Sequence, residues 1–142
     1  MDAPAVTTWS RGRGTETRSR PRELARRSPG WWLQFLGVAH AAVGAGVYRA
    51  ALGDIAREGV VSTVPDHGDK ATAFWFLAMA PTFWLGGRLL RSAESNGDVA
   101  AQQVAGTVLT ATGAAGAVAM PSVSGFWAVT AVGVAALRRS RG

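Results

Sequence analysis

Residues 99–137 read VAAQQVAGTVLTATGAAGAVAMPSVSGFWAVTAVGVAAL, and no Asp, Glu, Lys or Arg interrupts them. A membrane-spanning helix needs about 20 apolar residues, so these 39 residues are too many for one span and enough for two. The turn-forming residues of 120–125, MPSVSG, divide the stretch. The sequence therefore predicts two antiparallel transmembrane helices over about 99–119 and 122–137.

Two further apolar blocks precede this stretch. The block over 31–52 would extend about 33 Å as a helix, which is enough to cross the hydrocarbon core. The block over 71–90 contains Pro81, which removes a backbone hydrogen bond and predicts a kink. Residues 53–70 form a polar connection of mixed charge between the two blocks. Together the four blocks predict an all-α fold, namely an integral membrane antiparallel four-helix bundle.

Arginine dominates the two ends of the chain. Seven of the 15 basic residues precede the first block: Arg11, Arg13, Arg18, Arg20, Arg22, Arg26 and Arg27. Residues 1–30 are predicted to be disordered, because they offer too little apolar surface to offset the entropy of ordering. These seven arginines, two that flank the 91–98 loop and three at the C-terminus fall on one side of the four spans. Since basic flanks stay inside, we expect 1–30 and 139–142 to be cytoplasmic tails of a four-span domain over 31–138.

A cleaved signal peptide is the rival interpretation of the first block. An Arg-rich flank and an apolar run precede Ala39-His40-Ala41, which resembles an A-x-A cleavage site. The apolar run continues well past that site, which favours an uncleaved span.

Composition narrows the chemistry. The chain contains no cysteine, which excludes disulfides, thiolate metal sites and iron–sulfur clusters. Its net charge of +6 does not predict nucleic-acid binding, because the arginines lie in tails and loops beside apolar blocks. Anionic lipid head groups account for the same charge, at about 1 kcal/mol per basic residue near the surface. We therefore predict the lipid bilayer as partner, with head groups bound through the Arg-rich tail, and no catalytic residue, metal or cofactor.

His40 is the ionisable residue nearest the middle of a predicted span, which makes it a candidate for binding a proton, a metal or a haem. The alternative is a neutral imidazole hydrogen-bonded across a helix pair, to Thr107 or Thr110 at similar depth. A lone histidine lacks the second ligand or carboxylate partner that such chemistry needs, which favours the structural role.

Three glutamines lie at comparable depth near the cytoplasmic boundary, namely Gln34, Gln102 and Gln103. They are candidates for binding a substrate head group. Alternatively, they hydrogen-bond to one another and join the first and third spans, at roughly 0.6 kcal/mol per contact.

Three motifs carry a resemblance to a known family: GVAH at 37–40, AFWF at 73–76 and PSVSGFW at 121–127. They resemble a domain-of-unknown-function family of small bacterial four-span membrane proteins, over about residues 31–138. The resemblance implies a four-helix fold in the bacterial cytoplasmic membrane and brings no activity. The chain is similar, more weakly, to DoxX-like membrane proteins, some of which are linked to quinone or thiosulfate oxidation, but it lacks polar residues for such chemistry.

Two functional hypotheses follow. The favoured one is a non-enzymatic membrane protein that packs with itself as a homo-oligomer, with a partner or with lipid, because its helices are rich in Gly and Ala. The alternative is a membrane-bound redox or small-molecule transport subunit that uses His40 and the glutamines.

Overall fold

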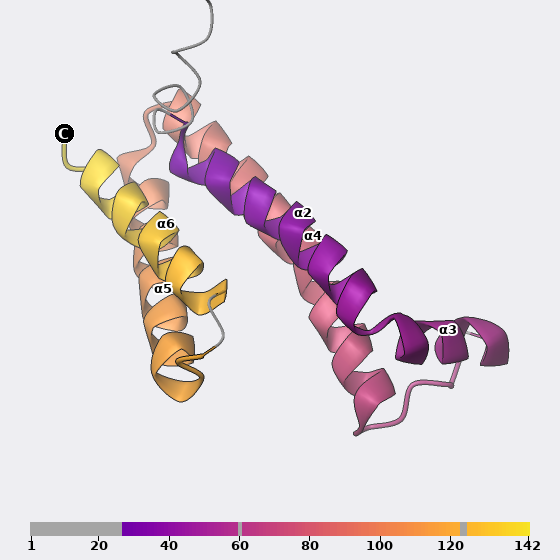
Figure 1. Ribbon diagram of the computed structural model, residues 1–142. Helices are drawn as coiled ribbons and strands as arrows, with labels where there is room; N and C mark the ends of the chain where they lie inside the picture. The colour runs from indigo at the N-terminus through magenta and orange to yellow at the C-terminus, as the bar shows by residue number, and fades with distance from the viewer. Residues whose placement is uncertain (1–26, 60, 123–124) are drawn as a thin grey trace, which may run out of the picture.

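The computed structural model describes residues 27–59, 61–122 and 125–142. Within these ranges the chain has five helices and no strand (Figure 1): α2 (Pro29–Val47), α3 (Arg49–Glu58), α4 (Asp69–Ser95), α5 (Val99–Ala119) and α6 (Gly125–Arg139). The predicted all-α class is confirmed. The disorder predicted for 1–30 falls mostly outside the described residues, whereas Pro29 and Gly30 belong to α2.

Local sequence explains where the helices begin. Ser28 caps α2, because its hydroxyl accepts a hydrogen bond from the Trp31 amide at 3.3 Å and Pro29 supplies a pre-set backbone angle. Asp98 caps α5 in the same way, accepting from the Ala101 amide at 2.9 Å. α5 therefore begins at Val99, and its bounds match the helix predicted over about 99–119.

The long helices form two antiparallel hairpins and not one closely packed bundle. α2 packs along α4 and α5 packs along α6, while contacts between the hairpins are sparse and involve α2 with α6 and α4 with α5. The hairpins approach each other at one end and diverge toward the other (Figure 1). Among the described residues α2 and α5 make no contact, so the first and third blocks do not adjoin.

The first block is not one helix over 31–52. α2 ends at Val47, and α3 leaves it at an angle of 78°. Gly44 and Gly46 weaken the helix before the break, and from Arg49 the sequence becomes amphipathic, RAALGDIARE. Part of the connection expected over 53–70 is therefore helical.

The remaining helices differ from expectation mainly in length. α4 extends beyond the expected 71–90 at both ends and continues as one helix through Pro81. α6 begins at Gly125, a few residues after the expected start of the 122–137 block. By length and hydropathy, no individual helix in the described ranges reaches the usual threshold for a membrane span, whereas the bent pair α2–α3 reaches it when taken together.

Small residues recur every seven positions along the contact of the first hairpin. These buried residues are Gly30, Gly37 and Gly44 on α2 and Ala73, Ala80 and Gly87 on α4. A seven-residue repeat keeps one stripe of each helix facing its partner. A Cβ added to Gly37 would lie 2.8 Å from the Trp84 backbone nitrogen and 2.9 Å from the Ala80 carbonyl oxygen. The glycines therefore let the two backbones touch.

The second hairpin has a reciprocal arrangement of glycine and threonine. A Cβ on Gly113 would lie 2.5 Å from the Thr130 nitrogen and hydroxyl, and a Cβ on Gly133 would lie 2.5 Å from the same atoms of Thr110. Each threonine hydroxyl donates to a carbonyl four residues earlier in its own helix, at 2.7 and 2.9 Å. Because the hydroxyls are satisfied locally, the helices approach closely without leaving a polar group unpaired.

Candidate functional site

His40 lies in the contact between α2 and α4. Its Nε2 is 3.0 Å from the Phe76 carbonyl oxygen, and its ring stacks on the Phe76 ring with centroids 3.8 Å apart. The Phe83 ring stands edge-on, with centroids 5.5 Å apart. A carbonyl oxygen can only accept, so Nε2 carries the hydrogen and donates it. The imidazole is thus hydrogen-bonded across a helix pair.

The partner of His40 differs from the expected Thr107 or Thr110. Both threonines belong to α5, which does not contact α2, and the Thr110 hydroxyl donates within its own helix. Phe76 could not be predicted from the sequence as the partner of His40, because the atom that accepts the hydrogen bond is a backbone oxygen. In the described ranges no group of three or more His, Cys, Asp or Glu side chains is arranged to hold a metal ion.

Replacing His40 with alanine is expected to destabilise the detergent-purified protein by about 2–3 kcal/mol, because it removes a hydrogen bond and an aromatic contact between helices. His67→Ala is the matched control, since His67 is exposed in the α3–α4 connection, and its effect should stay within about 0.5 kcal/mol. Thermal unfolding measures both variants. Equal stability of the two, or a haem band in the visible spectrum of the wild type, would contradict a structural role for His40.

The three glutamines do not meet. The Gln34 Oε1 accepts from Arg91 Nη1 at 3.0 Å, and the buried Gln102 donates through Nε2 to the Ala93 oxygen at 3.4 Å. Gln103 is exposed. Since α2 and α5 are apart, the expected hydrogen bonds between the first and third blocks are absent from the described residues. Gln34 and Gln102 instead each attach a neighbouring helix to α4.

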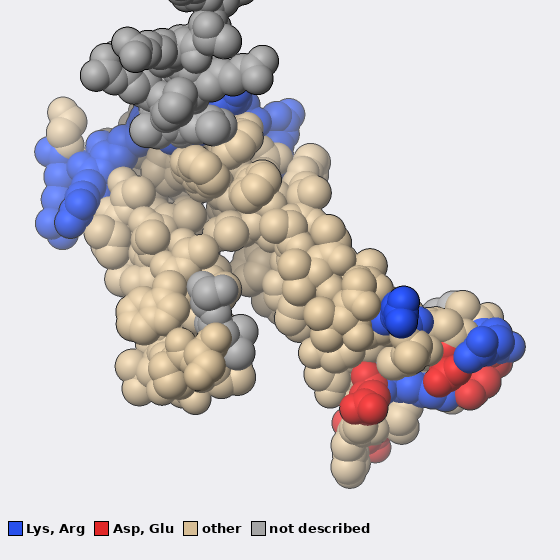
Figure 2. Space-filling view, viewed as in Figure 1, with Lys and Arg blue, Asp and Glu red and all other residues tan. Residues whose placement is uncertain are grey.

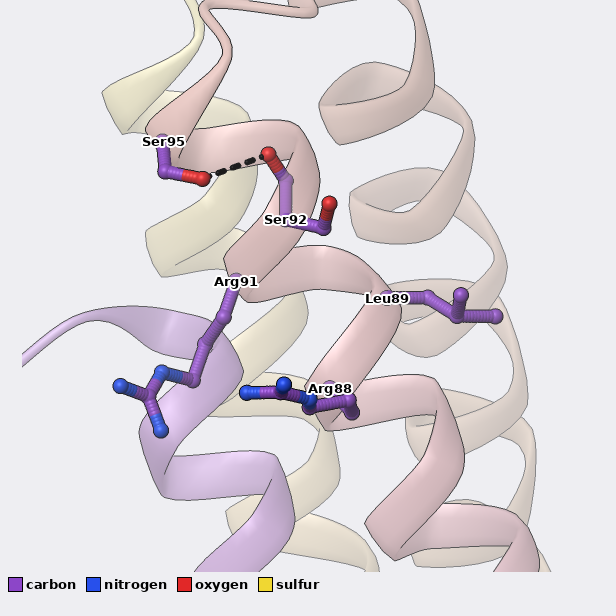
Figure 3. Close-up of a pocket in the computed structure, with 5 residues that line it drawn as sticks. All are labelled: Arg88, Leu89, Arg91, Ser92 and Ser95. Carbon is purple, nitrogen blue, oxygen red and sulfur yellow. Dashed lines mark hydrogen bonds between the residues drawn. The ribbon is translucent and has the colours of Figure 1, made fainter.

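An open pocket of about 430 Å³ lies on the last turns of α4 (Figure 3). The described residues that line it are Arg88, Leu89, Arg91, Ser92 and Ser95. The four polar members lie at positions i, i+3, i+4 and i+7, which places them on one helix face. This spacing was visible in the sequence, and it is the signal that could have identified Ser92 and Ser95.

Charged side chains gather at two ends of the molecule (Figure 2). One end, formed by the last turns of α4 and the end of α6, is predominantly basic, while α3 and its connection to α4 carry both signs. The ion pairs of the described residues, Arg57 with Asp54 and Lys70 with Glu58, both lie at the mixed end. Between the two ends, the face shown in Figure 2 displays no charged side chain.

Large apolar side chains are exposed along the helices. They include Phe35, Val38, Val43, Phe74, Trp75, Met79, Trp84, Leu85, Val104, Val108, Val118 and Trp127. Trp75 is 66% exposed and Trp84 47%. Half of the buried apolar residues are alanines, and no large side chain of the described chain is fully buried. Many large apolar side chains therefore face outward, whereas such groups usually lie inside.

Comparison with known proteins identifies one family. The model of a family of unknown function, DUF6463, matches residues 24–142. No curated protein and no solved structure matches the chain.

Proposed function

Because the chain belongs to the DUF6463 family, whose function is unknown, we propose a function from the distribution of its side chains. The protein is a non-enzymatic integral membrane protein of the bacterial cytoplasmic membrane. Its two helical hairpins pack through small residues within the bilayer and present large apolar side chains to lipid.

The many large apolar side chains on the outside of the helices carry this proposal. In water, exposed apolar patches on a monomer rarely exceed a few hundred Å². Lipid tails remove this restriction, and helices in lipid associate through Gly, Ala, Ser and Thr, which let backbones approach. Glycine at 30, 37 and 44 on α2 and at 106 and 113 on α5 matches that mode of packing. α6 falls short of the usual threshold for a span because it has 15 residues, and in α5 glycine, threonine and glutamine lower the mean hydropathy.

Charge and shape support a membrane orientation. The basic end holds the last turns of α4 and α6 and, by the tendency of basic flanks to stay inside, faces the cytoplasm with both termini. α3 is amphipathic and lies at 78° to α2, the geometry of a helix that rests in the membrane surface. On this proposal α3 marks the outer interface.

The contacts of His40 favour this function over a redox or transport subunit. Its Nε2 is engaged by the Phe76 carbonyl and its ring is covered by Phe76 and Phe83. Gln34, Gln102 and Gln103 do not converge on it or on one another.

Cysteine labelling tests the proposal cleanly, because the chain has no cysteine of its own. We expect a membrane-impermeant maleimide to label Asp66→Cys in spheroplasts and Ser140→Cys only after lysis. Val108→Cys should remain unlabelled in both, although Val108 is 57% exposed in the protein alone, because lipid would cover it. Carbonate extraction should leave the protein in the membrane fraction.

Two results separate the parts of the proposal. Recovery in the soluble fraction, with Val108→Cys labelled as rapidly as Asp66→Cys, would overturn membrane insertion. Labelling of Ser140→Cys in spheroplasts would instead reverse the orientation while leaving insertion intact.

A further inference from the structure

We propose that the α4 pocket binds the phosphate head group of an anionic phospholipid, with an acyl chain along the adjoining apolar surface of α4. This inference rests on the proposed membrane location. It assigns a specific site to lipid binding, which the sequence alone attributed to the N-terminal tail.

The pocket offers hydrogen-bond donors suited to phosphate oxygens. Arg88 and Arg91 lie one turn apart, and both guanidinium groups extend toward α2 (Figure 3). Arg91 uses one N–H on the neutral Gln34 oxygen at 3.0 Å, so this contact leaves its charge uncompensated. A guanidinium has five donors in a planar fork that matches phosphate geometry. Two such groups on one helix face therefore provide charge and directed hydrogen bonds together.

The serines complete the polar wall of the pocket. The Ser95 hydroxyl donates to the Ser92 carbonyl at 2.9 Å, as the dashed line in Figure 3 marks. The Ser92 hydroxyl accepts from Asn96 Nδ2 at 3.4 Å, which leaves its own hydrogen able to donate. Ser92 can thus add a neutral donor beside the two arginines.

The nearby carboxylates are engaged elsewhere. Glu94 accepts from the Gly30 amide at 3.2 Å, at the first turn of α2, and Asp98 caps α5. Within the described residues neither forms an ion pair with Arg88 or Arg91. The pocket therefore keeps a positive charge that attracts an anion.

An apolar wall distinguishes a lipid from free phosphate as the ligand. Leu89 lines the pocket, is 62% exposed and extends to the side away from α2 (Figure 3). Leu85, one turn earlier on the face of Arg88 and Ser92, is also exposed. Two exposed leucines one turn apart thus lie next to the basic donors along α4, which is the arrangement that an amphiphile with an anionic head requires.

Native mass spectrometry of the protein from nanodiscs of phosphatidylcholine with a minority of phosphatidylglycerol tests the site. We expect the wild type to retain phosphatidylglycerol preferentially, and R88Q/R91Q to lower its retention by roughly tenfold or more, since it removes the directed guanidinium–phosphate hydrogen bonds together with the charge. R138Q/R139Q is the matched control, because it removes the same charge from exposed positions at the same end. It should lower retention clearly less than R88Q/R91Q does, because it removes only diffuse attraction to the membrane surface.

Each outcome decides the inference. Equal losses in the two double variants would overturn the site, because net charge alone would then explain binding. Displacement of the lipid by excess inorganic phosphate would overturn the lipid assignment in favour of a free phosphate site. Neither result bears on membrane insertion, which the cysteine labelling decides by itself.

Discussion

Gly87→Ala is expected to destabilise the protein by about 3 kcal/mol, whereas Gly86→Ala should stabilise it by up to about 1 kcal/mol. The two glycines are neighbours in α4 and differ in what a side chain would meet. A Cβ at Gly87 would lie 2.5 Å from the Gln34 backbone nitrogen and 2.6 Å from the Gly30 carbonyl oxygen, so the backbones of α4 and α2 would have to separate. A Cβ at Gly86 would only reach ordinary contact with Leu33, at 3.6 Å.

The opposite signs make this pair of variants informative. Gly86→Ala gains helix propensity at no steric cost, while Gly87→Ala gains the same propensity and loses the contact of α2 with α4. Thermal unfolding in detergent measures both, and the difference between them removes the shared propensity term. Equal stability of the two variants would contradict the close approach of the α2 and α4 backbones.

Helix formation could be predicted from the sequence more fully than helix arrangement. Apolar blocks, Asp98 as a cap and Pro121 after the last turn of α5 are local signals, and the helices follow them. The break at Tyr48 was missed because hydropathy averaged over 31–52 conceals the change from an apolar to an amphipathic pattern. Periodicity, and not mean hydropathy, contains that information.

The candidate site was harder to predict, because depth along a helix does not determine neighbours. Gln34 and Gln102 were grouped by their distance from the expected membrane boundary, yet they bond to Arg91 and to the Ala93 carbonyl on α4. His40 was singled out as a candidate, but the partner of its imidazole is a backbone oxygen that carries no sequence signature. The pairing of α2 with α4, set by glycines seven residues apart, decides which side chains meet.

The second hairpin gives the other large expected effect. Gly113→Ala should destabilise the protein by about 3 kcal/mol, at the upper end of overpacking costs, because its Cβ would lie 2.5 Å from the Thr130 nitrogen and 2.9 Å from its Cα. Gly125→Ala is the control, since no described residue lies within 4 Å of a Cβ placed there. Thermal unfolding in detergent measures the difference.

A rescue experiment identifies the atoms responsible. Thr130→Ala should not rescue Gly113→Ala, because the backbone of α6 remains in place when the hydroxyl is removed. Gly116→Ala presents the contrasting case, since its Cβ would overlap the ring of Phe126, and Phe126→Leu should recover much of the loss. In double-mutant cycles we expect a coupling above about 1 kcal/mol for 116 with 126 and close to zero for 113 with 130. Equal rescue at both positions would mean that side chains, and not touching backbones, set the spacing of α5 and α6.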